Sequence, residues 1–171
     1  MNDSRPITFF THVPKTAGTA QFAATFQHAF DPEQIGRFRG YKHLVLSKCR
    51  FSVLRGHYAY GTHHCCEPSG AFEYFTMLRE PVSRLMSYYW FYKQSSAYAH
   101  PVYEDVATHT LLEFSAKPKY QNVQTRFLAG IHYQYLGKTI NLNNWLGRRV
   151  LNRAIDSLPP SQKHRWTTQD E

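Results

Sequence analysis

One lysine and several small hydroxyl residues lie in the stretch VPKTAGTA, between an apolar run and a helical pattern. The start of a helix exposes unpaired backbone N–H groups and the positive end of the helix dipole, and small residues let an anion approach them. Lys15 adds a point charge, and Thr16 and Thr19 add hydroxyl donors. The sequence therefore predicts a phosphate-binding turn made of Pro14, Lys15, Thr16, Ala17, Gly18 and Thr19.

The order of residues in this turn differs from that of nucleoside triphosphatases. Their loop reads GxxxxGK[ST], with the lysine after the glycines, whereas Lys15 precedes Thr-Ala-Gly-Thr. Those enzymes also need an acidic side chain to hold Mg²⁺, but the third expected strand runs into Leu78 and Arg79. A nucleotide kinase or NTPase with an unusual loop therefore remains only as an alternative, which Mg²⁺-dependent ATP hydrolysis would support.

Apolar runs and turn residues predict the elements that position this turn. We expect strands at 7–13, 51–55 and 72–78, because each is short, rich in β-formers and bounded by turn residues. Phe22, Phe26 and Phe30 recur every four residues, which predicts a helix over 18–30, and Pro81 suits the first turn of a second helix. This alternation predicts an α/β fold with a parallel sheet, in which ligands bind beyond the carboxyl ends of the strands.

Two stretches together resemble a known family. PKTAGT after one strand and LREPVSRLMSYY after a later one resemble the sulfotransferases of the heparan sulfate and uronyl 2-O-sulfotransferase type, and NVQTRFLAG at 122–130 is typical of bacterial relatives. The resemblance implies a P-loop NTPase-like three-layer fold and 3′-phosphoadenosine 5′-phosphosulfate (PAPS) as co-substrate. It also implies that the 14–19 loop binds the 5′-phosphosulfate, that Arg79 and Ser87 bind the 3′-phosphate, and that His57 in Gly56-His57 is the general base.

The chemistry of these residues fits such a transfer, in which entering and leaving oxygens lie in line and positioning and charge stabilisation dominate. Lys15 would stabilise the departing 5′-phosphate, and His57 would take the proton of an acceptor hydroxyl, for which a carbohydrate is the expected class. The reaction requires no metal. Structural alternatives are a solvated Lys15, an Arg79 that only pairs with Glu80 at a helix start, a packing role for Ser87 and a structural His57.

HYAYGTHHCCE offers a rival zinc site, with His57, His63, His64, Cys65, Cys66 and Glu67 as possible ligands. Zinc ligands are usually paired two to four residues apart, with a second pair well downstream. Neighbouring residues on an extended chain point apart, and no second pair follows. We therefore predict no metal site here and expect these histidines to contact substrate anions, because the segment lies where the acceptor would enter.

The formal net charge of +8 over 171 residues predicts a polyanionic partner. This leaves a third alternative, a non-catalytic protein that binds polyanions through its basic surface, although the sequence contains no aromatic-basic pattern of a nucleic-acid module.

Cys49, Cys65 and Cys66 form no disulfide framework and suggest a reducing compartment. No signal peptide or membrane span is evident, so we expect a cytoplasmic protein, whereas animal relatives are Golgi membrane proteins.

The remaining chain predicts helices around 110–114, 121–128 and 142–158, with 33–50 irregular and basic. We expect one domain over 1–158 and a polar tail over 159–171. The resemblance covers residues 7 to about 130. Relatives continue with a further buried strand that is not evident here, so the C-terminal part of the fold is expected to be incomplete.

Overall fold

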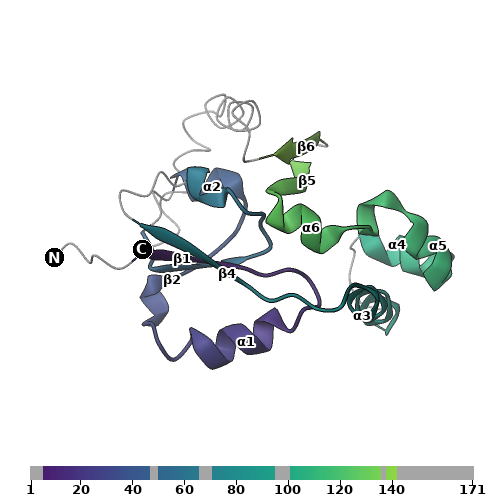
Figure 1. The fold of residues 1–171 in the computed structure, drawn as a ribbon, viewed down its shortest axis with the longest axis horizontal. Helices are drawn as coiled ribbons and strands as arrows, with labels where there is room; N and C mark the ends of the chain where they lie inside the picture. The colour runs from purple at the N-terminus through teal and green to yellow at the C-terminus, as the bar shows by residue number, and fades with distance from the viewer. Residues whose placement is uncertain (1–5, 47–49, 66–70, 95–100, 136–137, 142–171) are drawn as a thin grey trace.

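The computed structural model describes residues 6–46, 50–65, 71–94, 101–135 and 138–141 (Figure 1). These residues form six strands, six α-helices and three short 3-10 turns. In chain order they are β1 (Ile7–Thr11), α1 (Gly18–Thr25), η1 (Pro32–Gln34), β2 (Ile35–Arg37), α2 (Tyr41–Leu46), β3 (Val53–Gly56), η2 (Thr62–Cys65), β4 (Phe72–Thr76), α3 (Pro81–Gln94), α4 (Pro101–Thr108), α5 (Leu111–Ala116), η3 (Pro118–Tyr120), α6 (Val123–Leu128), β5 (Ile131–Tyr135) and β6 (Lys138–Asn141).

Four parallel strands form the sheet in the order β2-β3-β1-β4, which confirms the predicted α/β class with a parallel sheet. β1 lies between β3 and β4, with Thr11 in register with Gly56 on one side and with Thr76 on the other. Parallel strands have their carboxyl ends at the same edge of a sheet. The loops that follow β3, β1 and β4 therefore leave the sheet side by side at this edge.

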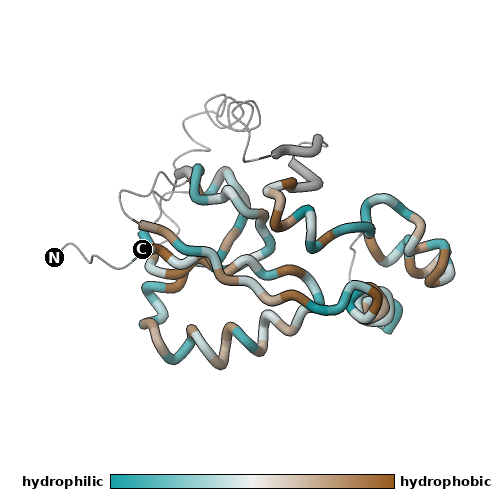
Figure 2. The backbone as a smooth tube through the Cα atoms, in the orientation of Figure 1, coloured by the Kyte–Doolittle hydropathy of each residue, from teal (hydrophilic) through white to brown (hydrophobic). Residues whose placement is uncertain are grey.

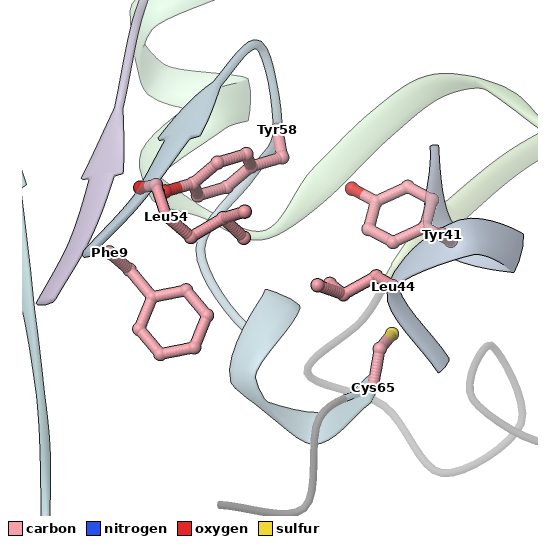
Figure 3. Packing of buried hydrophobic residues seen from close by; sticks show 6 residues of the cluster. All are labelled: Phe9, Tyr41, Leu44, Leu54, Tyr58 and Cys65. Carbon is pink, nitrogen blue, oxygen red and sulfur yellow. The ribbon is translucent and has the colours of Figure 1, made fainter. Parts of the chain in front are cut away.

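Helices cover both faces of the sheet because successive residues of β1 point to opposite sides. Phe10 packs on one face with Phe22 of α1 and with Phe26, the residue that follows this helix. Phe9 packs on the other with Tyr41 and Leu44 from α2 (Figure 3). Figure 2 shows the corresponding hydrophobic stretches along the strands of the sheet. Full burial of one such phenylalanine contributes about 1.5–3 kcal/mol, so these two clusters hold β1 and its loop in place.

Several predicted elements were correct in type but too long. The first strand ends at Thr11 rather than residue 13, and α1 ends at Thr25 rather than residue 30. Phe22 and Phe26 are buried and Phe30 packs against them, so the predicted apolar face is confirmed although the last part is a turn. The irregular segment predicted at 33–50 was wrong in part, because it contains β2 and α2. Both are too short to be stable alone and depend on pairing with β3 and burial against the sheet.

The second half of the chain forms a smaller core in which α3, α4, α5 and η3 pack together. Phe114 of α5 is fully buried and stacks on Tyr120, with ring centroids 3.8 Å apart. The predicted helix around 110–114 is confirmed as α5, which Thr110 and Glu113 begin with reciprocal hydrogen bonds. The predicted helix at 121–128 is confirmed as α6. The sequence patterns missed α4 and the β5-β6 hairpin.

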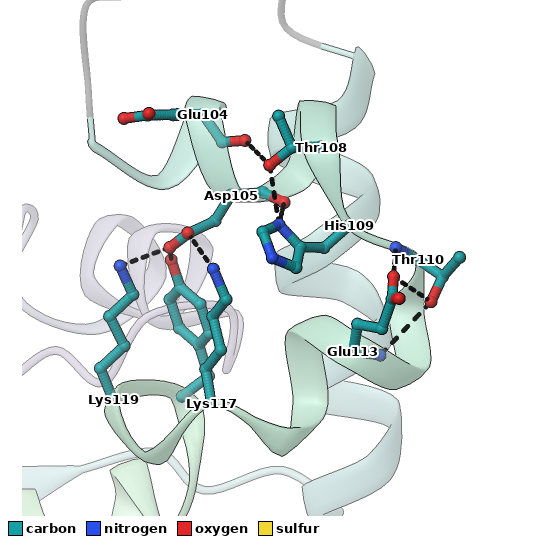
Figure 4. Close-up of polar contacts among 9 residues, drawn as sticks. Glu104, Asp105, Thr108, His109, Thr110, Glu113, Lys117 and Lys119 are labelled. Carbon is teal, nitrogen blue, oxygen red and sulfur yellow. Dashed lines mark hydrogen bonds and ion pairs between the residues drawn. The ribbon is translucent and has the colours of Figure 1, made fainter.

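Asp105 of α4 ties this smaller core together (Figure 4). It is 8% exposed and pairs with Lys117, Lys119 and the Tyr120 hydroxyl. Burial opposes its ionised form, but these three donors outweigh burial and hold the pKa of its carboxyl well below its usual range.

The predicted helix at 142–158 and tail at 159–171 lie outside the described residues. Of the helices in the described ranges, none combines the length and the apolar character that crossing a bilayer requires.

Candidate functional site

The 14–19 loop adopts a conformation that L-amino acids rarely take. Lys15 and Ala17 have φ angles of 68° and 64°, in the left-handed region that non-glycine residues seldom enter. Thr16 between them is buried, and its hydroxyl donates to the Val13 carbonyl at 2.8 Å. The Thr16 hydroxyl thus stabilises the loop backbone in this conformation. Strained residues of this kind cluster at ligand-binding turns.

The loop leads directly into the start of α1, as predicted. Ala17 is its N-cap residue and makes no side-chain cap hydrogen bond, and the first turn holds no acidic residue. Among the described residues, the N–H groups of this turn therefore have no side-chain partner, which favours an anion there. Gly18 is required at the helix start because a Cβ built on it would lie 2.2 Å from His12 Cδ2.

The strain at Ala17 leads to a stability prediction. Ala17→Gly is expected to raise the free energy of unfolding by about 0.5–1 kcal/mol, because glycine adopts a positive φ without steric cost. Ala20→Gly, at an exposed position inside α1, is the control and should lower it by about 0.5–1 kcal/mol. Urea unfolding of both variants checks this. An equal loss of unfolding free energy in the two variants would show that residue 17 does not hold the left-handed conformation.

One face of α3 lies against this loop. The Arg84 guanidinium Nη1 donates to the Pro14 carbonyl at 3.5 Å, and the Lys15 ammonium lies 4.0 Å from the centre of the Phe91 ring. Ser87 is three residues after Arg84 and four before Phe91, so helical spacing puts it on the same face. The structure therefore brings Lys15 and Ser87, predicted to bind one nucleotide, onto elements that face each other.

Arg79 follows β4 and is exposed at the start of α3. The side-chain amide of Gln124 holds its backbone from both sides: the Arg79 N–H donates to Gln124 Oε1 at 2.9 Å, and Gln124 Nε2 donates to the Arg79 carbonyl at 2.8 Å. Gln124 comes from the 122–130 stretch that contributed to the family resemblance. That stretch therefore fixes the turn that presents Arg79.

Glu80 has its own role at this turn. Its carboxylate accepts hydrogen bonds from the backbone N–H groups of Ser83 at 2.6 Å and Val82 at 2.9 Å, which cap the first turn of α3. These bonds, that of Ser83 foremost, lower the pKa of Glu80. Glu80 thus begins the helix through these backbone hydrogen bonds, and an ion pair between Arg79 and Glu80 is not required for that purpose.

His57 follows β3 at the same edge of the sheet and is exposed. Its Nδ1 lies 2.6 Å from the backbone oxygen of His12. A carbonyl oxygen can only accept, so the proton must be on Nδ1 and the lone pair of the neutral ring on Nε2. The backbone thereby sets the tautomer in which Nε2 can accept a proton.

His12, which the sequence analysis did not single out, joins the loop to His57. Its ring stacks on that of His57 with centroids 4.6 Å apart, and it also lies against Gly18. Burial, followed by the electrostatic influence of His57, Arg55 and Lys15, lowers the pKa of His12 to about 4, so it is neutral near pH 7. Its position directly after β1 could have identified it as a site residue, because ligands bind at this edge of a parallel sheet.

Within the stretch considered as a rival zinc site, His63 and Cys65 are packed into the core. His63 is buried, stacks on Phe72 at 3.9 Å, and its backbone N–H donates to the Tyr74 hydroxyl at 3.0 Å. Cys65 lies inside the core (Figure 3). Within the described ranges, no three His, Cys, Asp or Glu side chains are grouped as metal ligands would be. Cys66 and Glu67 lie outside those ranges.

In comparisons with known proteins, the chain matches no protein-family model, no curated protein and no solved structure.

Proposed function

We propose that this protein is a PAPS-dependent sulfotransferase that acts on a hydroxyl group, with a carbohydrate as the favoured acceptor. The observation that carries the proposal is the meeting of three loops at one edge of the sheet. They follow β3, β1 and β4, and they hold His57, Lys15 and Arg79 respectively. A P-loop-like three-layer arrangement of the whole domain is part of the same proposal.

The loop fits the phosphate end of such a nucleotide. The start of α1 offers N–H groups without a side-chain partner, and Lys15 lies beside them. The Lys15 ammonium packs on Phe91, a contact with an exposed ring worth about 0.5–1 kcal/mol, so a stronger anionic partner can draw it away. Arg79, just before the start of α3, and Ser87, on the face of α3 toward the loop, would bind the 3′-phosphate.

The reaction breaks the bond between sulfur and the 5′-phosphate oxygen and forms a bond from sulfur to the acceptor oxygen. The acceptor hydroxyl transfers its proton to His57 Nε2, and adenosine 3′,5′-bisphosphate leaves with the 5′-phosphate charge that Lys15 stabilises. The hydrogen bond from Nδ1 to the His12 carbonyl keeps His57 in the tautomer that this step requires. The neutral, stacked His12 holds the ring without competing for the proton.

Calorimetric titration with adenosine 3′,5′-bisphosphate, with ATP as the comparison, tests the proposal. Selective binding of the bisphosphate at micromolar affinity or better is the expected result. Selective ATP binding with Mg²⁺-dependent hydrolysis would favour the NTPase alternative. A folded chain that binds neither nucleotide but binds heparin-like polymers would favour the non-catalytic polyanion binder.

Lys15→Ala is expected to lower the rate of transfer from PAPS by about 10²–10³-fold, because the charge on the leaving phosphate loses its stabilising partner. Lys42→Ala removes the same charge from α2, on the other face of the sheet from α1, and is the control. The measurement is the release of adenosine 3′,5′-bisphosphate with a polysaccharide acceptor. Equal rates in the Lys15 variant and the wild type would remove Lys15 from the mechanism.

A further inference from the structure

A charged residue that the sequence analysis passed over is buried beside the loop. Arg84 of α3 is only 4% exposed. Among the described residues, its side chain makes one hydrogen bond, from Nη1 to the Pro14 carbonyl, which at 3.5 Å is weak. A guanidinium has five N–H donors in a fixed planar fork, and one long bond to a neutral oxygen leaves most of that capacity unused.

The charge of Arg84 also lacks a counter-ion in the described part of the chain. No carboxylate there lies within ion-pair distance of it, and the nearby Arg126 is another cation. Burial of the guanidinium, the largest influence, lowers the pKa of Arg84. A buried charge without a partner costs several kcal/mol, so its presence needs an explanation.

Asp105 shows how this chain buries a charge for structure alone. Two lysines and a tyrosine hydroxyl contact its carboxylate (Figure 4). In the part of the chain that the structure describes, Arg84 has no such set of partners. It lies against a loop whose other features favour an anion, namely the start of α1 without a side-chain cap and the Lys15 ammonium. Arg84 and Phe91 are two helical turns apart on α3. Because the Lys15 ammonium lies over the Phe91 ring, α3 contacts two cationic groups, Arg84 at one point and Lys15 two turns further on.

We propose that Arg84 is an anion-binding residue of the 14–19 loop and donates hydrogen bonds to the same phosphate group that the loop backbone and Lys15 bind. In the nucleotide this is the 5′-phosphate, whereas Arg79 and Ser87 serve the 3′-phosphate. The identity of the nucleotide rests on the proposed function, but the phosphate site on Arg84 does not. Arginine suits this place because its fork matches two phosphate oxygens at once.

The competing role for Arg84 is purely structural, as a donor that holds the Pro14 carbonyl. Arg84→Gln separates the two roles, because glutamine keeps an N–H donor for that carbonyl and removes the charge. Arg39→Gln, at an exposed position after β2, removes the same charge elsewhere and is the matched control. Thermal unfolding of each full-length variant first establishes that it is folded.

Affinities are then measured calorimetrically for inorganic pyrophosphate, adenosine 5′-phosphate and adenosine 3′-phosphate. Loss of a charged hydrogen-bond donor is expected to weaken pyrophosphate and adenosine 5′-phosphate binding by about 10- to 100-fold in Arg84→Gln. Binding of adenosine 3′-phosphate should change less than twofold in this variant. Arg79→Gln should show the reverse pattern, and Arg39→Gln should bind all three probes as the wild type does.

The other outcomes are equally decisive. Unchanged pyrophosphate and 5′-phosphate binding in folded Arg84→Gln would overturn the inference and leave the sulfotransferase proposal standing. Equal losses for the 5′- and 3′-phosphates would also overturn it. Arg84-dependent binding of pyrophosphate by a wild-type chain that binds neither adenosine phosphate nor the bisphosphate would uphold the anion site and reject the proposed function. A wild-type chain that binds none of the probes would reject both.

Discussion

His57→Ala is expected to slow sulfuryl transfer by about 10²–10⁴-fold, the usual contribution of a general base, while the affinity for adenosine 3′,5′-bisphosphate is retained. The reason is geometric: the His12 carbonyl holds the proton on Nδ1 and leaves Nε2 of His57 as the proton acceptor. The measurement is the rate of bisphosphate release from PAPS in the presence of a polysaccharide acceptor, together with calorimetric binding of the bisphosphate.

Two further variants decide whether His57 acts as a base or only positions the loop. His57→Asn keeps an N–H donor for the His12 carbonyl but provides no basic nitrogen, so it should be as slow as His57→Ala. His28→Ala, exposed in the turn after α1, should keep the wild-type rate. Recovery of activity in His57→Asn would assign His57 a positioning role and remove it as the base.

Asp105→Asn is expected to lower the free energy of unfolding at pH 7 by about 2–4 kcal/mol, because a buried carboxylate with three donors loses its charge. Glu104→Gln is the matched control: it removes one negative charge at the neighbouring, exposed position of the same helix. That change should stay within about 0.5 kcal/mol of the wild type. Urea unfolding of the two variants gives the comparison.

The same carboxylate makes stability depend on acid pH. Because the folded state lowers the pKa of Asp105, its contribution is complete above the unfolded value of about 4 and is lost as the pH falls toward the folded value. The wild type should therefore lose stability below pH ~4 more steeply than Asp105→Asn. Parallel acid limbs in the two proteins would show that Lys117, Lys119 and Tyr120 do not stabilise the charged form.

Local sequence carries enough information for the core of the sheet. The runs around β1, β3 and β4 and the four-residue spacing of Phe22 and Phe26 predicted the α/β class. They also placed the 14–19 loop and His57 at the carboxyl edge, because parallel strands share that edge. In contrast, β2 and α2 were missed, since three and six residues carry too little periodicity to distinguish them from a loop.

The residue types and spacing in the sequence thus determined which chemistry is available: a lysine in a small-residue turn, a histidine after a strand, and an arginine and a serine eight residues apart. Only the tertiary structure decided how these groups are supported. It placed His12 on His57, Gln124 on Arg79 and the buried Arg84 against Pro14. These pairs are separated by 45 to 70 residues. No local pattern encodes them, because burial and hydrogen bonding between distant segments are settled only when the strands and helices pack.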